Sequence, residues 1–178
     1  MKKLFIGAVM AIGTFISTIS LSFADELLVP HMTYRVGPYA ANGTMIANGF
    51  TDYFLMLNER DGGIGGIKVN PEECETGYKA QVGVECYESY RGKNALVHTP
   101  NSTGITLQIL QKSPEDGVPI LTMGYGLSAA AKGESFPWAF NYPASYWSKM
   151  TSILSYIDSQ NGLKDQKIGF LYLDVGYG

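Results

Sequence analysis

The chain has 178 residues with 16 acidic and 13 basic side chains, and its formal net charge is −3 at pH 7. A chain with this charge lacks the basic footprint that a nucleic-acid-binding protein needs. Charged residues make up 16% of the chain and hydrophobic residues 46%, with 21 glycines, which excludes a disordered protein and is typical of an α/β fold with many tight turns.

The first 24 residues have the pattern of a cleaved signal peptide. Two lysines precede an apolar stretch over residues 4–16, and Ser22 and Ala24 put small residues where a signal peptidase cuts. We expect the mature chain to begin at Asp25 in the periplasm. A membrane anchor is the alternative, since residues 4–24 carry no charge, although the second half of that stretch is polar.

The rest of the chain alternates between strand and helix patterns. Short apolar runs between turn residues predict strands, and apolar residues spaced three and four apart predict helices. The expected strands or extended segments cover residues 27–34, 67–73, 95–98, 118–123, 138–142 and 167–173. The expected helices cover residues 45–60, 79–91, 104–112 and 146–161, and residues 37–43 are expected to form a loop. Pro30 predicts that the first strand is irregular or at a sheet edge.

This alternation predicts a mostly parallel sheet flanked by helices on both faces. Ligands of such sheets bind beyond the carboxyl ends of the strands. The candidate site loops are therefore those that follow strands, residues 35–43, 74–78, 99–104 and 124–128.

The last predicted strand, residues 167–173, is continuously apolar, which indicates a strand covered on both faces. Residues 174–178 would form the loop that leaves it. Nothing follows to complete that sheet. We therefore expect the chain to be the front part of a longer two-lobed protein, with the first lobe complete and the second lobe only begun.

The loop over residues 99–104 follows a strand and opens a helix. Ser102 and Thr103 place two hydroxyls beside free backbone N–H groups, an arrangement that suits a carboxylate. The alternative is that one of these residues is an ordinary N-cap of the helix.

The segment over residues 124–129 fits the G-x-G-x-x-A form of the dinucleotide fingerprint, but it follows the fourth strand and no acidic residue lies about twenty positions further on. Around Ser128 it also resembles a nucleophile elbow without the final glycine. His31 and His98 both precede Ser128, so a hydrolase is disfavoured but stays open. Neither histidine has a partner at metal-ligand spacing, and no metal or cofactor is expected.

Several aromatic residues occur in or near these same loops. They are Tyr34, Tyr39, Tyr125, Tyr146 and Trp147. Together with the hydroxyls and free amides they predict a pocket for a small ligand with an apolar part and a charged head.

The two cysteines lie close together in the sequence. Cys74 is expected at the end of a strand and Cys86 in the next helix. Export would allow them to form a disulfide, and two buried thiols are the alternative.

Several segments occur together in a familiar order. They are residues 37–43 (GPYAANG), 58–66 (NERDGGIGG), 73–76 (ECET), 102–104 (STG), 119–124 (PILTMG) and 168–178. In this order and spacing the chain resembles the branched-chain amino acid substrate-binding proteins of ABC transporters, which are type I periplasmic binding proteins of the leucine/isoleucine/valine-binding family. The resemblance covers nearly all of residues 25–178.

The resemblance implies a binding protein, not an enzyme, with two α/β lobes that close on a ligand. The first lobe would cover residues 25–141 and the second would begin with residues 142–178. The partners would be an amino acid or small carboxylate and an ABC permease in the inner membrane. The implied ligand-binding residues are Ser102, Thr103, Gly104, Gly124, Tyr125, Gly126, Tyr39, Asn42, Tyr146, Trp147 and Tyr177.

The chain departs from the family pattern in two places. Asn42 stands where relatives often have an aromatic residue, and Tyr125 and Gly126 stand where they have small and hydroxyl residues. The ligand could therefore be a branched-chain amino acid, another amino acid, an amide or an aromatic carboxylate. The same lobes could also form an extracellular ligand-sensing domain of a receptor.

Overall fold

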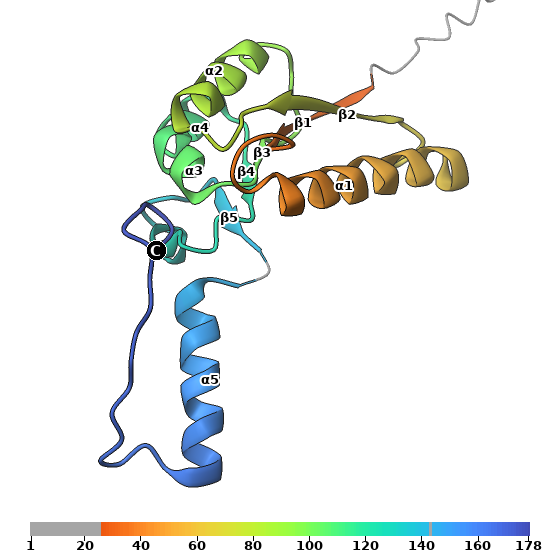
Figure 1. Cartoon of the computed structure of the whole chain (residues 1–178). Coiled ribbons are helices and arrows are strands. Elements are labelled where there is room, and N and C mark those ends of the chain that lie inside the picture. The colour runs from red at the N-terminus through yellow and green to blue at the C-terminus, as the bar shows by residue number, and fades with distance from the viewer. Residues whose placement is uncertain (1–25, 143) are drawn as a thin grey trace, which may run out of the picture.

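Five short parallel strands form the centre of the body in the computed structural model, which describes residues 26–142 and 144–178 (Figure 1). The predicted signal peptide lies outside these residues. The strands are β1 (Leu27–Thr33), β2 (Val69–Glu75), β3 (Thr99–Pro100), β4 (Ile120–Thr122) and β5 (Ala139–Asn141). Strands β2, β1 and β3 form one parallel sheet in that order, and β4 pairs with β5.

A bridge between His98 and Ile120 joins the two sheets. The backbone N–H of His98 donates to Pro119 O at 2.9 Å, and the N–H of Leu121 donates to His98 O at 2.9 Å. The strands therefore form one layer in the order β2-β1-β3-β4-β5, which confirms the predicted α/β class with a mostly parallel sheet.

Helices cover both faces of this layer. In chain order, the helices of the described residues are α1 (Ala40–Asp61), α2 (Ala80–Tyr90), α3 (Thr103–Ile109), α4 (Lys112–Asp116), the 3-10 helix η1 (Ser128–Ala131) and α5 (Tyr146–Asn161). Figure 1 shows α1 on one side of the β2–β1 pair, with α2 and α3 on the other. The core between the sheet and α2 and α3 consists of Met32, Cys86, Tyr87, Ile105, Ile109 and Ile120. None of the helices in the described part of the chain is long and apolar enough to cross a bilayer.

The prediction that Pro30 places the first strand at a sheet edge is wrong, because β1 is paired on both sides. The Thr99 hydroxyl donates to Pro30 O at 2.8 Å, and the Thr122 hydroxyl donates to Pro100 O at 2.9 Å. On the other side of β1, the Thr76 hydroxyl donates to the carbonyl of Thr33 at 2.7 Å. Buried side-chain hydroxyls thus join neighbouring strands, and two of these three bonds go to carbonyls of prolines, residues that have no backbone N–H to donate.

Three predicted boundaries are also wrong. The predicted loop over 37–43 already contains the first turn of α1, whose N-cap is Tyr39. The sequence predicts a strand over residues 95–98, but the strand that pairs with β1 is β3 at Thr99–Pro100. The predicted helix over 104–112 is two helices, α3 and α4, because the chain turns between Leu110 and Gln111.

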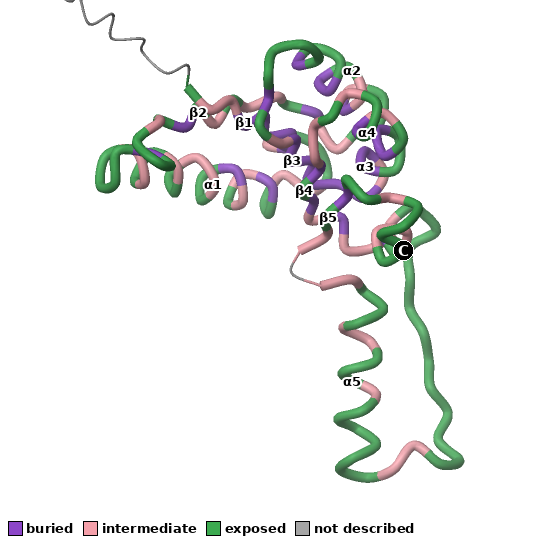
Figure 2. The backbone as a smooth tube through the Cα atoms, turned by 180° about the vertical axis from the view of Figure 1, so that it is seen from behind, coloured by how far each residue is buried: buried purple, intermediate pink, exposed green. Residues whose placement is uncertain are grey.

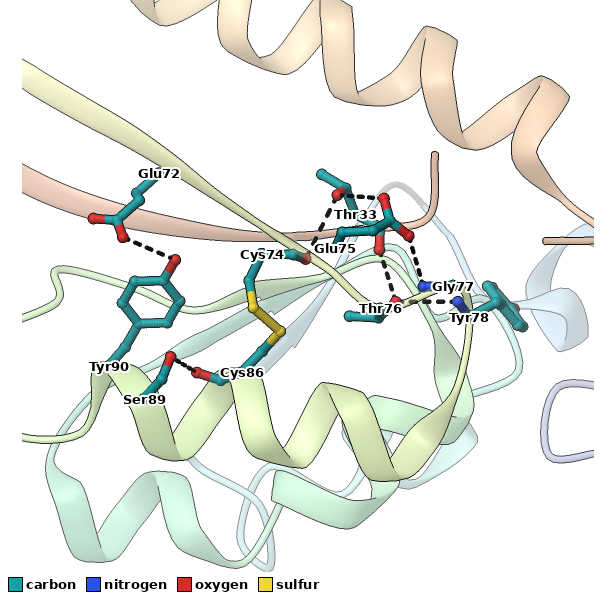
Figure 3. Close-up of a disulfide and its surroundings, with 10 residues drawn as sticks. All are labelled: Thr33, Glu72, Cys74, Glu75, Thr76, Gly77, Tyr78, Cys86, Ser89 and Tyr90. Atoms are coloured by element: carbon teal, nitrogen blue, oxygen red, sulfur yellow. Dashed lines mark hydrogen bonds between the residues drawn. A yellow bond between two sulfur atoms is a disulfide. The ribbon is translucent and has the colours of Figure 1, made fainter. Parts of the chain in front are cut away.

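Cys74 of β2 and Cys86 of α2 are joined by a disulfide in the structure, with their Cα atoms 5.9 Å apart (Figure 3). The bond closes a loop with a sequence separation of 12. Closing a loop of this size stabilises a domain by about 3 kcal/mol. The disulfide therefore fixes α2 on the sheet next to the loop that follows β2.

Helix α5 projects away from the body, and the chain returns beside it in an extended form (Figures 1 and 2). The prediction of a buried strand over 167–173 is wrong for this structure, since Leu171 is fully exposed and Phe170 is 64% exposed. A strand forms only against a neighbour, and no described strand lies beside this segment. Its final residues return to the body, where the Tyr177 and Tyr39 hydroxyls are 2.9 Å apart.

Helix α1 approaches the end of β1 so closely that Gly43 leaves no room for a side chain. A Cβ atom on Gly43 would lie 2.0 Å from Tyr34 O and 2.3 Å from Cδ2 of the Tyr34 ring. The missing side chain therefore sets how near α1 lies to the carboxyl end of β1. Gly49, also in α1, has nothing within 4 Å of the same position.

We predict that Gly43→Ala lowers the free energy of unfolding by about 3 kcal/mol, because the backbone of Tyr34 or the whole helix must move. Gly49→Ala is the matched control and should raise it by about 0.5–1 kcal/mol through helix propensity. Denaturant unfolding of the two variants measures both values. Equal effects of the two substitutions would contradict the close approach of α1 to β1.

Candidate functional site

A pocket lies at the carboxyl ends of the strands, at the point in the sheet where the direction of the strand order reverses. The connection from β1 runs to β2 on one side and the connection from β3 runs to β4 on the other, and ligands of such sheets bind beyond the strand ends at this point. The pocket has a volume of about 460 Å³. Its lining residues follow four strands, lie near the starts of α1 and α5 or, for Tyr177, lie in the segment after α5. They are Tyr34, Tyr39, Asn42, Met45, Ile46, Tyr78, Asn101, Thr103, Met123, Tyr125, Tyr146 and Tyr177.

Six tyrosines dominate this lining. The Tyr34 and Tyr78 rings pack edge to face at 4.9 Å, and Tyr39 lies 4.6 Å from Tyr78. Burial raises the pKa of Tyr34 and of Tyr78, and the hydrogen bond with Tyr39 raises the pKa of Tyr177 to about 12. These phenols are therefore uncharged at neutral pH and offer both apolar ring surface and hydroxyl groups.

The β3–α3 segment supplies the buried polar groups of the pocket. Asn101 is 8% exposed and Thr103 is 2% exposed. The Thr103 oxygen accepts a hydrogen bond from the Gly126 N–H at 3.3 Å, so its own proton is left to donate. A polar atom of a ligand in the pocket could form hydrogen bonds with both Asn101 and Thr103.

Ser102 has a different role from its neighbour. It is the N-cap of α3, and its hydroxyl oxygen accepts from the Ile105 N–H at 3.4 Å. The N-cap alternative considered from the sequence is therefore what the structure shows for Ser102. Thr103, not Ser102, faces the pocket.

An ion pair fixes the loop after β1 to strand β2 at the edge of the site. Arg35 donates to both carboxylate oxygens of Glu73 at 2.7 Å, which lowers the pKa of that carboxyl. The Glu75 carboxylate accepts from the backbone N–H groups of Arg35 at 2.7 Å and Gly77 at 2.6 Å. Figure 3 shows Glu75 beside Thr33, Gly77 and Tyr78. Arg35 and Glu73 neutralise each other, Glu75 is held by backbone N–H groups, and none of the three lines the pocket.

The Lys149 ammonium group contacts two of the tyrosine rings that line the pocket. The Lys149 Nζ atom is 3.7 Å from the centroid of the Tyr125 ring and 5.5 Å from that of Tyr146. This cation–π contact fixes the start of α5 against the loop after β4. The Tyr146 N–H also donates to Tyr125 O at 2.8 Å.

The structure brings together six of the residues proposed from the sequence, namely Tyr39, Asn42, Thr103, Tyr125, Tyr146 and Tyr177. It places five others outside the lining, namely Ser102, Gly104, Gly124, Gly126 and Trp147. Trp147 is 72% exposed and borders a separate hollow with Phe136 and Ser128. Gly124 and Gly126 have a packing role, since a Cβ on Gly124 would lie 3.0 Å from Thr103 Cα and one on Gly126 would lie 2.6 Å from Tyr177 Cα.

Tyr34 is among the aromatic residues that the sequence places in the pocket, but sequence reasoning did not assign five other lining residues to the ligand, namely Tyr78, Asn101, Met45, Ile46 and Met123. Tyr78 and Asn101 lie in loops already selected because they follow strands, so that rule alone would have found them. Met45 and Ile46 depend on α1 beginning at Ala40, which the apolar periodicity does not reveal.

His31 and His98 are both fully buried. His31 lies 3.8 Å from the Phe50 ring and His98 lies 4.5 Å from the Tyr87 ring. The Nδ1 atom of each has no hydrogen-bond partner among the residues that the structure describes. In residues 26–142 and 144–178, no group of three or more His, Cys, Asp or Glu could hold a metal ion.

A family model described as periplasmic binding protein matches residues 27–178. The chain belongs to the periplasmic binding protein family. The resemblance found in the sequence is thereby confirmed at the level of the family. No curated protein sequence matches the chain.

Three solved structures illustrate the similarity. One, described as an ABC transporter permease from the Pseudomonas fluorescens group, has 34% identity and a TM-score of 0.70 over 78% of this chain and 34% of its own. The branched-chain amino acid transporter substrate binding protein LivJ from Streptococcus pneumoniae, in complex with isoleucine, has 16% identity and a TM-score of 0.62 over 76% and 38%.

The third is a solute binding protein of an ABC transporter from Rhodopseudomonas palustris BisB5, in complex with 3,4-dihydroxy benzoic acid. It has 17% identity and a TM-score of 0.64 over 79% of this chain and 38% of its own. At such identities the last two structures show the fold alone. The chain spans roughly a third of the length of these proteins.

The buried histidines predict a loss of stability on mild acidification. Burial lowers the pKa of His31 and of His98 from 6.5 to about 4. Between these values the unfolded chain binds protons that the folded chain does not, so the free energy of unfolding falls as the pH falls. The loss is on the order of 3 kcal/mol for each histidine over the full window.

Denaturant unfolding at about pH 7 and about pH 5 measures the part of this loss that falls above pH 5, which is on the order of 2 kcal/mol for each histidine. His98→Gln removes one of the two contributions and should reduce the loss by roughly half. An unfolding free energy that does not change between these pH values would contradict the burial of two neutral imidazoles.

Proposed function

We propose that the chain is part of the solute-binding component of an ABC importer and binds an amino acid or a related small carboxylate. The observation that carries the proposal is the pocket at the reversal of strand order, where uncharged tyrosines surround Asn101 and Thr103. Apolar walls with a few buried polar groups are typical of small-molecule sites. Membership of the periplasmic binding protein family supports the same role.

The division into lobes is also a proposal. Residues 25–141 would form the first lobe, and residues 142–178 would begin the second. The position of α5 away from the body supports a boundary near residue 142 (Figure 1). Closure of the lobes would hold Tyr146 and Tyr177 against the ligand.

The lining favours a ligand with a planar or aromatic part. Six phenol rings face the pocket, whereas Met45, Ile46 and Met123 are its aliphatic lining residues. The relative from Rhodopseudomonas palustris was solved with 3,4-dihydroxy benzoic acid and the one from Streptococcus pneumoniae with isoleucine. Aromatic carboxylates and branched-chain amino acids are therefore the first compounds to test.

Binding accounts for the site better than hydrolysis does. Ser128, the residue in the elbow-like pattern, begins η1, and no hydrogen bond joins it to either histidine among the described residues. Export by the predicted signal peptide and delivery of the ligand to an inner-membrane permease complete the proposed role. A receptor's ligand-sensing domain is the second candidate, and a membrane span encoded after a second lobe would distinguish it.

Calorimetric titration with amino acids and aromatic carboxylates tests the proposed function. We predict that Thr103→Val weakens binding by about tenfold, the value of one lost hydrogen bond, while Thr103→Ser retains binding. Ser102→Ala is the matched control, and it should lower stability by about 1 kcal/mol without changing the dissociation constant.

Heat signals absent for every compound would contradict the proposed function. Unchanged affinity in folded Thr103→Val would remove only Thr103 from the site.

A further inference from the structure

His31 of β1 is a fully buried residue that contacts the pocket lining. Its Nε2 atom faces the side-chain nitrogen Nδ2 of Asn101, and Asn101 lines the pocket. Its Nδ1 atom has no hydrogen-bond partner among the described residues. The Phe50 ring covers a face of the imidazole at 3.8 Å and an interplanar angle of 41°, so it offers no acceptor in the plane of the imidazole.

The environment of His31 selects one tautomer. Burial lowers its pKa to about 4, while Glu73 has a smaller raising effect and Arg35 a smaller lowering effect. The ring is therefore neutral at neutral pH and carries one N–H. If the proton were on Nδ1, a buried donor would have no acceptor. If the proton is on Nε2, only a lone pair is left unpaired. Buried N–H groups without acceptors are the rarer case, which favours the Nε2–H tautomer.

An Nε2–H group requires an oxygen opposite it. Half a turn of the Asn101 amide exchanges its oxygen and nitrogen without moving another atom. The oxygen of Asn101 then accepts from His31, and its NH₂ group is the part left to face the pocket. Beside it, the Thr103 hydroxyl keeps its proton free because its oxygen accepts from Gly126. Two hydrogen-bond donors therefore meet at the same wall of the pocket.

We infer that His31 is a positioning residue of the ligand site, which fixes the Asn101 amide so that the pocket selects ligand groups that accept hydrogen bonds. Carboxylate and carbonyl oxygens are such groups, and ammonium groups are not. The ligand part of this inference rests on the proposed function. The orientation of Asn101 does not.

Nuclear magnetic resonance of the chain labelled with ¹⁵N-histidine tests the orientation without a ligand. Long-range proton–nitrogen spectra identify which ring nitrogen of His31 carries the proton, and the spectrum of His98→Gln assigns the two histidines. We expect the proton on Nε2. A proton on Nδ1 would overturn the inference, because Asn101 would then present its oxygen to the pocket.

Calorimetry with benzoate and benzylammonium tests the selection, since the two probes share a ring and differ in the head group. We expect benzoate to bind at least about tenfold more tightly. His31→Met should reduce this preference several-fold, because the Asn101 amide can then turn. His98→Met is the matched control, because it also removes a buried imidazole but does not contact Asn101, and it should leave the preference unchanged.

A preference for benzylammonium, or an unchanged preference in folded His31→Met, would overturn the inference. If neither probe binds, the result counts against the proposed function, and the tautomer alone decides the role of His31. If His31→Met does not fold, the tautomer in the unsubstituted chain is again decisive.

Discussion

The buried threonine hydroxyls that join neighbouring strands are the interaction on which the rest of the structure depends. Strand β3 contains two residues and β4 three, so ordinary strand pairing gives them few hydrogen bonds. Thr99 and Thr122 add bonds to the carbonyls of Pro30 and Pro100, and the Thr106 hydroxyl lies 2.8 Å from that of Thr122. These bonds align the carboxyl ends of β1, β3 and β4, where the pocket forms.

The site then follows from what each strand end carries. The absence of a side chain at Gly43 brings α1 and Tyr39 close to Tyr34. The disulfide joins β2 to α2 on either side of the loop that contains Tyr78, and the Arg35–Glu73 ion pair holds the loop after β1 on β2. The charged groups of Arg35, Glu73 and Glu75 are paired or hydrogen-bonded within the protein and do not line the pocket. The pocket is therefore lined by neutral rings and a few polar groups, which suits retention and release of a small molecule better than chemistry on it.

The sequence predicts much of this fold because the apolar periodicities of β1, α2 and α5 are clear and local. It also selects the loops that line the pocket, since parallel strands place their carboxyl ends at one edge. It does not predict the start of α1, because Tyr39 caps the helix by its backbone position and Gly43 resembles a turn residue. It does not predict that residues 167–173 are exposed, because whether an apolar segment becomes a buried strand depends on a neighbour that no local pattern supplies.

Chemical-shift mapping of the tyrosine rings during titration with 3,4-dihydroxybenzoate and with isoleucine tests the central claim most directly. The account predicts that shifts concentrate on Tyr34, Tyr39 and Tyr78, at the carboxyl ends of the strands. Tyr90 lines a separate hollow with Arg91 and His98, away from the carboxyl ends of the strands. Its ring should not shift. Shifts centred on Tyr90, or none in any ring with either compound, would contradict a ligand site at the strand ends.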